Sequence, residues 1–279
     1  MRPPKPHRQR VRRGAYLLPS AFTIGTMLLG FYAVVLGLRG AFGGDPGAFQ
    51  KAALMVFVAI VVDTLDGRIA RLTGTESAFG REYDSLADAA TFGFVPALLA
   101  YLWGLRGLED VWDLRGLDRV GWLVPLYFFV CTATRLARFN VQAALPASHR
   151  WFVGLPAPAA AGAVCSLLFV VPDSDWRPWL NGLLLATLIV VGTLEVSTFR
   201  YWSPKQIHFR RRWSYRALLV LAAAILLFSF QPRLFLPIAA ALYTVSGPLG
   251  WLIRRVRPAE PEPDAEAGAA GDEPQESTP

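Results

Sequence analysis

Four aspartates lie in one stretch of the chain. Their carboxylates can bind metal ions and accept protons. Asp63 and Asp66 stand three positions apart, and Asp84 and Asp88 stand four positions apart. In a helix, either spacing places both side chains on one face. Two neighbouring helices would therefore bring four carboxylates together at the edges of apolar stretches.

Such a group of acids needs a compensating charge. An acidic side chain at the centre of a membrane-spanning helix costs about 2.5 to 3.5 kcal/mol. Carboxylates at close range do not all stay ionised without a counter-charge, and their hard oxygens favour Mg²⁺ or Mn²⁺. We therefore predict that the four aspartates bind two divalent metal ions. The alternative is that they cap helices or pair with nearby arginines, which would explain one or two acids but not four at regular spacing.

Small residues accompany the acids. Gly67 and Gly80 lack side chains, and Ala70 is the next smallest residue on the first helical stretch. These positions allow a helix or a flat base to approach closely. Close helix packing alone is the alternative, since small residues are common at helix contacts in membranes.

The elements that must position these residues are long apolar segments. The chain has 279 residues, of which 53% are apolar. Eight stretches are near the ~20 residues that a spanning helix needs. They lack the alternation of a membrane barrel, and a spanning backbone must satisfy its own hydrogen bonds. We predict an all-α integral membrane protein with about eight transmembrane helices, at residues 16–38, 48–66, 86–104, 120–141, 153–171, 178–197, 214–231 and 234–253.

Charge predicts the orientation and the chain ends. The 28 Lys and Arg residues exceed the 21 Asp and Glu residues, and most fall in segments that are cytoplasmic if the N-terminus is inside. This bias and attraction to anionic membrane lipids account for the positive charge, so no nucleic-acid partner is expected. We predict a basic cytoplasmic tail at 1–14, a membrane-embedded domain at 15–257 and a disordered acidic tail at 258–279. Both termini and the acidic site would be cytoplasmic, in the inner membrane of a bacterium.

The spacing of eight residues resembles a known signature. The string Asp63-x2-Asp66-Gly67-x2-Ala70-Arg71-x8-Gly80-x3-Asp84-x3-Asp88 is similar to that of the CDP-alcohol phosphatidyltransferase family. The resemblance implies a six-helix catalytic core, here followed by two C-terminal helices, and often a homodimer. It implies two divalent metals, with Asp63 and Asp84 touching both, Asp66 completing the first site and Asp88 the second. It also implies that Asp88 is the general base.

The same resemblance implies a CDP-lipid site and a reaction. Gly67, Arg71 and Ser77 would hold the CDP-lipid, with Ala70 and Gly80 beside them. An incoming hydroxyl would attack the lipid-side phosphorus of CDP-diacylglycerol and release CMP.

The acceptor is indicated by three further stretches, which resemble the branch of the family that uses serine. They begin at Asp84, Arg135 and Gly154, and with them the resemblance covers roughly residues 15 to 215. Arginine forms paired hydrogen bonds with carboxylates, so Arg135 and Arg138 are predicted to bind the carboxylate of serine. The alternative is that both arginines only anchor the helix end at the cytoplasmic surface.

Other functions remain open from the sequence. The same chemistry could use glycerol 3-phosphate or inositol phosphate as acceptor. A membrane prenyltransferase also combines acidic helices with Mg²⁺ and a diphosphate, but lacks the glycine and Ala-Arg framework. A divalent-cation or lipid transporter could line its path with aspartates.

Overall fold

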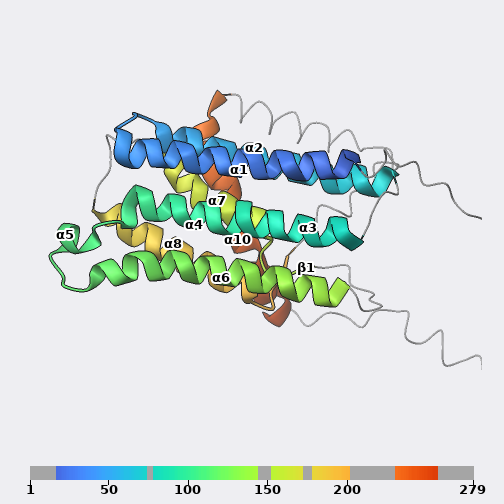
Figure 1. Ribbon diagram of the computed structural model, residues 1–279. Helices are drawn as coiled ribbons and strands as arrows, with labels where there is room; N and C mark the ends of the chain where they lie inside the picture. The colour runs from blue at the N-terminus through green and yellow to red at the C-terminus, as the bar shows by residue number, and fades with distance from the viewer. Residues whose placement is uncertain (1–16, 74–77, 144–151, 172–177, 202–229, 257–279) are drawn as a thin grey trace, which may run out of the picture.

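The structure is a bundle of long helices (Figure 1). The computed structural model describes residues 17–73, 78–143, 152–171, 178–201 and 230–256. The elements are α1 (Leu17–Gly43), α2 (Ala48–Thr73), α3 (Ala78–Asp88), η1 (Ala89–Phe94), α4 (Val95–Ala100), η2 (Tyr101–Leu105), α5 (Leu108–Trp112), α6 (Leu117–Ala143), β1 (Phe152–Val153), α7 (Ala157–Val170), α8 (Trp179–Val196), β2 (Arg200–Tyr201) and α10 (Pro232–Val256).

Six helical segments in the described residues are long and apolar enough to cross a membrane. They are Ala21–Gly43, Ala48–Ile69, Phe79–Leu105, Leu117–Gln142, Trp179–Val196 and Arg233–Ile253. Large apolar side chains such as Leu28, Phe31 and Phe42 point outward and are exposed. Lipid can cover such an apolar surface, whereas a water-soluble monomer rarely exposes an apolar surface of this extent. The prediction of an all-α integral membrane protein is confirmed.

The helix expected at residues 153–171 begins later than predicted. Gly154 has a left-handed backbone with φ of 84°, and Pro156 is extended. Helix α7 therefore starts only at Ala157 and has 14 residues. The preceding residues form β1, one strand of a pair not foreseen from the sequence. The span expected at 214–231, apart from its last residues, and both predicted tails lie outside the described residues.

The third span is one continuous helical segment with two π-helical stretches. Helix α3 passes through η1, α4 and η2 without a break in direction (Figure 1). Pro96 lies in the first turn of α4 and cannot donate a backbone hydrogen bond to the turn before it. A local π-helical turn accommodates such a missing bond, and π-helical turns often occur at functional sites. Here η1 begins immediately after Asp88.

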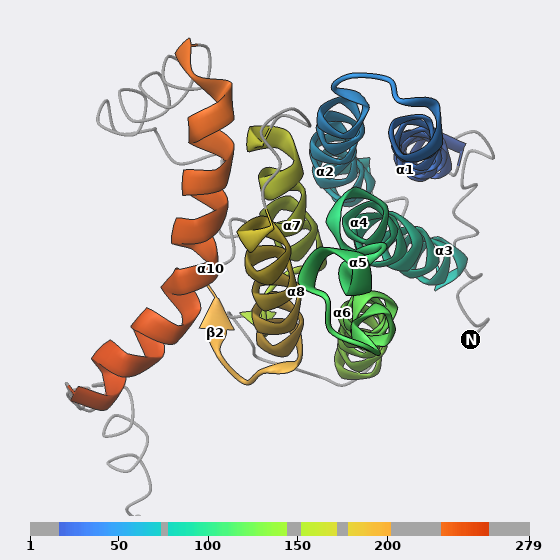
Figure 2. The ribbon, with the colours of Figure 1, turned by 90° about the vertical axis from the view of Figure 1, so that its left-hand side faces the viewer.

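Small residues let the helices pack closely. Helix α1 lies along α2, α6 along α8, and α7 between α2 and α10. Ala52, Ala53 and Ala59 of α2 are fully buried, as are Ala160 and Ala161 of α7. In membranes, helix association depends on this close contact between small side chains. Figure 2 shows α10 at one side of the bundle, beside α7 and α8.

A short strand pair fastens α10 to the end of α8. Strands β1 and β2 are antiparallel, with Phe152 opposite Tyr201. The Tyr201 hydroxyl donates a hydrogen bond to the carbonyl oxygen of Thr244 on α10, at 3.0 Å. Burial, and secondarily the nearby Tyr243, raises the pKa of Tyr201 to about 12. Tyr201 therefore remains a hydrogen-bond donor at any physiological pH.

Candidate active site

Three of the four signature aspartates, one from α2 and two from α3, bring their carboxylates together. Asp63 of α2 and Asp84 and Asp88 of α3 each offer one carboxylate oxygen, and these oxygens lie within 4.8 Å of one another. All three side chains are partly buried. Three carboxylates at this distance repel one another unless a cation lies between them.

Asp66 lies one helical turn further along α2 and outside this group of three oxygens. Its side chain is only 5% exposed. Thr23 of α1 donates a hydrogen bond to its Oδ2 at 2.7 Å, while the buried Oδ1 has no hydrogen-bond partner among the described residues. Helix α1 therefore orients this carboxylate and leaves one oxygen available to a ligand.

The donor set fits divalent metal ions. Carboxylate oxygens are the ligands that Mg²⁺ and Mn²⁺ prefer. Oδ1 of Asp88, like Oδ1 of Asp66, is buried without a hydrogen-bond partner in the described part of the chain. A buried carboxylate oxygen without a partner is costly, and a metal ion would remove that cost. The residues present therefore suit the two ions that the sequence predicts.

Glycines bring α6 against the helix that carries Asp88. A methyl group on Gly93 of η1 would lie 3.0 Å from Phe129 and 3.1 Å from Thr132, both on α6. On the other side of α6, a methyl group on Gly192 of α8 would lie 3.4 Å from the backbone of Phe128. Helices η1, α6 and α8 thus pack with almost no space between their backbones at this level.

This packing buries Arg135 of α6 beside the acids. Its side chain is 8% exposed and interacts electrostatically with Asp88 and with Glu195 of α8. Arg138 lies one turn later and points elsewhere, since its Nη1 donates to the carbonyl oxygen of Val196 at 3.3 Å. The structure therefore separates the two arginines that the sequence could not distinguish.

Two polar residues of this region were missed in the sequence. Glu195 is 1% exposed, and Thr132 of α6 is fully buried and donates a hydrogen bond to Glu195 Oε2 at 2.8 Å. The available signal was the same as for the aspartates, an acid inside a stretch that otherwise suits lipid. Glu195 stands alone in its stretch, so spacing gave it no partner.

Several predicted residues cannot be compared with the structure. Ser77 and the side chains of Ala70 and Arg71 lie outside the described residues, whereas Gly67 and Gly80 are described and partly buried.

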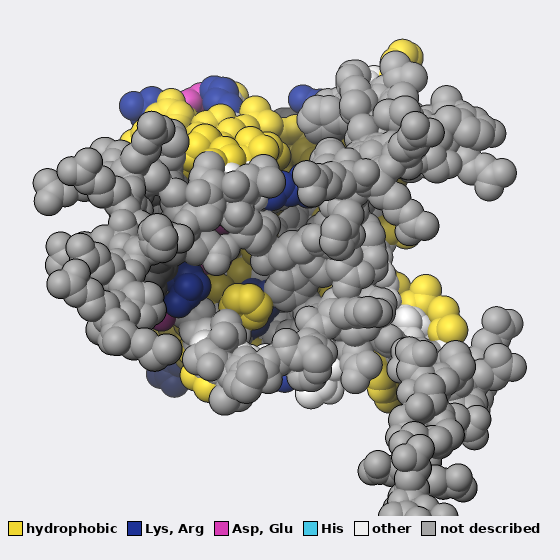
Figure 3. Space-filling model, turned by 90° about the vertical axis from the view of Figure 1, so that its right-hand side faces the viewer, with side chains coloured by type: hydrophobic (Ala, Val, Ile, Leu, Met, Phe, Trp, Pro, Cys, Tyr) yellow, Lys and Arg dark blue, Asp and Glu magenta, His cyan; other side chains and the backbone are white. Residues whose placement is uncertain are grey.

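Figure 3 views the end of the bundle at which α2 ends and α3 begins, where Lys and Arg side chains are visible. Cationic groups at this end suit a phosphate-bearing ligand.

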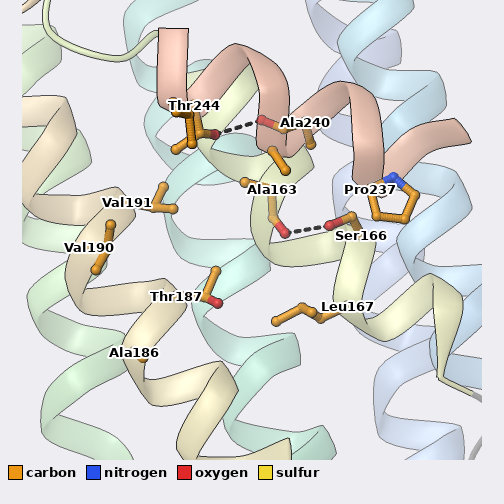
Figure 4. A pocket seen from close by; sticks show the side chains of 12 residues that line it. Ala163, Ser166, Leu167, Ala186, Thr187, Val190, Val191, Pro237, Ala240 and Thr244 are labelled. Atoms are coloured by element: carbon orange, nitrogen blue, oxygen red, sulfur yellow. Dashed lines mark hydrogen bonds between the residues drawn. The ribbon is translucent and has the colours of Figure 1, made fainter. Parts of the chain in front are cut away.

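An apolar pocket of about 370 Å³ lies elsewhere, between α7, α8 and α10 (Figure 4). Three hydroxyl groups line it, those of Ser166, Thr187 and Thr244, and each donates to a carbonyl oxygen of its own helix. None of the described residues that line it is acidic or basic. These residues therefore offer an apolar surface and no group for phosphoryl chemistry.

Comparisons with known proteins place the chain among membrane enzymes with one kind of name. Residues 16–198 match the model of the family described as CDP-alcohol phosphatidyltransferase. A CDP-diacylglycerol–serine O-phosphatidyltransferase of Helicobacter pylori is 32% identical over 246 residues, which is 87% of this chain and 94% of that protein. The proteins with the same name from Mycobacterium tuberculosis and Saccharomyces cerevisiae are 37% identical over 191 residues and 36% identical over 148 residues. These matches cover 66% and 51% of this chain, and 60% and 50% of those proteins.

Proposed function

Since the chain belongs to the CDP-alcohol phosphatidyltransferase family, we propose that it transfers a phosphatidyl group from CDP-diacylglycerol to the hydroxyl of L-serine, which yields phosphatidylserine and CMP. The observation that carries the proposal is the group of three carboxylate oxygens within 4.8 Å, with a buried arginine beside Asp88. The similarity to a serine-using relative over 94% of that relative's length supports serine as acceptor.

The aspartates have two roles in this proposal. Two divalent ions would be held by Asp63, Asp66, Asp84 and Asp88. Such ions would neutralise charge on the diphosphate and on the leaving CMP. Asp88 also accepts the proton of the serine hydroxyl. Asp88 offers one carboxylate oxygen to the group of three, so its other oxygen would take that proton.

The bond changes balance. The serine oxygen forms a bond to the lipid-side phosphorus, and the bond from that phosphorus to the bridging oxygen of the diphosphate breaks. The hydroxyl proton goes to Asp88, and CMP leaves with the bridging oxygen. Arg71 and Ser77 would donate hydrogen bonds to the phosphates, and Gly67, Ala70 and Gly80 leave room for the nucleotide.

Arg135 is the better of the two candidates for the serine carboxylate. It is buried next to the proposed base, whereas Arg138 already donates to the end of α8. A guanidinium held near Asp88 would place the acceptor hydroxyl close to the atom that takes its proton. We further propose that the enzyme is a homodimer in a bacterial inner membrane, with this site on the cytoplasmic side.

The test is release of CMP by the detergent-purified full chain. The assay contains CDP-diacylglycerol and Mn²⁺ or Mg²⁺, with serine, glycerol 3-phosphate, inositol phosphate or no acceptor. We expect release with serine, its loss on chelation of the metal, and its loss in Asp88→Asn. Release only with another alcohol would keep the chemistry and reject serine. No release under any condition, together with ion or lipid flux in vesicles, would favour a transporter.

A further inference from the structure

Two buried side chains at the proposed acceptor site, a carboxyl group and a guanidinium, have unused hydrogen-bonding atoms. Thr132 donates to Oε2 of Glu195, but Oε1 is buried without a hydrogen-bond partner in the described part of the chain. Nε of Arg135 is in the same situation. The side chains are 1% and 8% exposed.

Unused atoms on two buried ionisable side chains indicate a missing partner. A polar group buried without a hydrogen bond is costly, and the penalty is larger for charged groups. Proteins accept this penalty mostly at functional sites, where a ligand removes it. A ligand that satisfied both atoms would have to present a hydrogen-bond donor to Glu195 and an acceptor to Arg135.

The end of α8 is held rigidly around Glu195. The backbone N–H of Leu155 donates to the carbonyl oxygen of Leu194 at 3.0 Å, and Arg138 donates to that of Val196. Gly154 packs directly on the carbonyl group of Glu195. The backbone on both sides of Glu195 is thus fixed by α6 and by the loop before α7, as expected for a residue whose position must be exact to less than 1 Å or so.

We propose that Arg135 and Glu195 together recognise the zwitterion of an amino-acid acceptor, with the guanidinium donating to its carboxylate and Glu195 accepting from its ammonium group. Thr132 positions Glu195. Because Asp88 neighbours Arg135, a hydroxyl on the side chain of the bound amino acid would lie near the proposed base. The inference rests on the proposed function and extends it to the basis of acceptor selection.

Glu195 would also reject the competing acceptors. Glycerol 3-phosphate and inositol phosphate carry a negative charge and no ammonium group. A carboxylate repels a phosphate, and neither compound has a cationic donor that would offset this repulsion. Arg135 alone would attract either kind of anion, so Glu195 is the residue that distinguishes them.

The experiment compares serine with 3-hydroxypropionate, which is serine without its ammonium group. CMP release by the purified full chain gives the KM for serine. Competition against serine gives the inhibition constant of 3-hydroxypropionate whether or not that compound reacts. In the unmodified enzyme we expect 3-hydroxypropionate to bind about 10- to 100-fold more weakly than serine, as the loss of a charged hydrogen bond requires.

Glu195→Gln keeps the shape of the side chain and an acceptor for Thr132. We expect it to raise the KM for serine about 10- to 100-fold and to change the inhibition constant of 3-hydroxypropionate and the KM for CDP-diacylglycerol less than about threefold. Thr132→Val, which removes only the positioning hydroxyl, should raise the serine KM several-fold. Glu109→Gln, on α5 at the opposite end of the bundle, is the matched control and should change none of these constants.

Two results would overturn the inference. One is equal binding of serine and 3-hydroxypropionate by the unmodified enzyme. The other concerns Glu195→Gln, provided that its thermal stability is normal. If this variant binds both ligands equally more weakly, or has only a lower kcat, Glu195 has a purely structural role. Failure of the proposed function is a separate result, because serine-dependent CMP release would then be absent before any substitution is made.

Discussion

Replacing Gly154 by alanine disturbs the support of Glu195 in two ways. Gly154 has a φ of 84°, and this left-handed conformation costs a residue with a side chain about 1 to 2 kcal/mol. An added methyl group would also overlap the carbonyl oxygen of Glu195 and lie 3.1 Å from its carbonyl carbon. These are backbone atoms, so no side-chain rotation relieves the overlap. With about 1 to 3 kcal/mol for overpacking, we expect a total loss of about 2 to 5 kcal/mol of stability.

Two other glycines separate these contributions. Gly116 has the same φ of 84°, but a methyl group there meets nothing within 4 Å. Gly182 lies inside α8, also with nothing within 4 Å and without a positive φ. Gly116→Ala should therefore lower the free energy of unfolding by only about 1 to 2 kcal/mol, through backbone strain. Gly182→Ala should raise it by up to about 1 kcal/mol, because alanine has the better helix propensity.

The assay is thermal unfolding in detergent, followed by CMP release. Melting temperatures should fall in the order Gly182→Ala, unmodified protein, Gly116→Ala and Gly154→Ala. A shift of the Glu195 backbone on the order of 1 Å should lower kcat/KM for serine by up to about 100-fold, in Gly154→Ala alone. If Gly154→Ala melted together with Gly116→Ala and kept its kcat/KM for serine, the described contact between the loop and α8 would be refuted.

Three further substitutions test the contacts around the site. Thr23→Val removes the donor to Asp66 and should cost about 1 to 3 kcal/mol of stability and raise the metal concentration needed for half-maximal CMP release, whereas Thr23→Ser should restore both. Gly93→Ala presses on Thr132 at about 3.1 Å and should lower kcat/KM for serine several-fold with little change in the KM for CDP-diacylglycerol; an unchanged serine constant would contradict the close packing of α6. Tyr201→Phe should cost about 1 kcal/mol below pH 10, and this difference in melting temperature should shrink as the pH rises from 10 towards 12, because the raised pKa stabilises the fold only while the hydroxyl keeps its proton.

The sequence predicted those features that depend on local spacing. Acids three or four positions apart lie on one helix face in any helix, and a lipid environment requires long apolar helices. The sequence therefore predicted that Asp63, Asp84 and Asp88 lie close together. In the structure, one carboxylate oxygen of each lies within 4.8 Å of the others. The membrane fold and the family followed from the same local patterns. The metal ions, the roles of the site residues and the chain-end segments stay predictions.

Only the tertiary structure decided how distant helices share the site. Arg135 and Arg138 are equivalent in sequence, yet packing against Gly93 and α8 buries one beside Asp88 and turns the other to the end of α8. Glu195 is far from the aspartates along the chain, and no spacing rule connects it to them. Helical periodicity determines which face a residue occupies, but not which helix meets that face. Which helices meet depends on where small residues let two backbones approach closely. The effect of a single glycine on this contact is therefore visible only once the helices are packed.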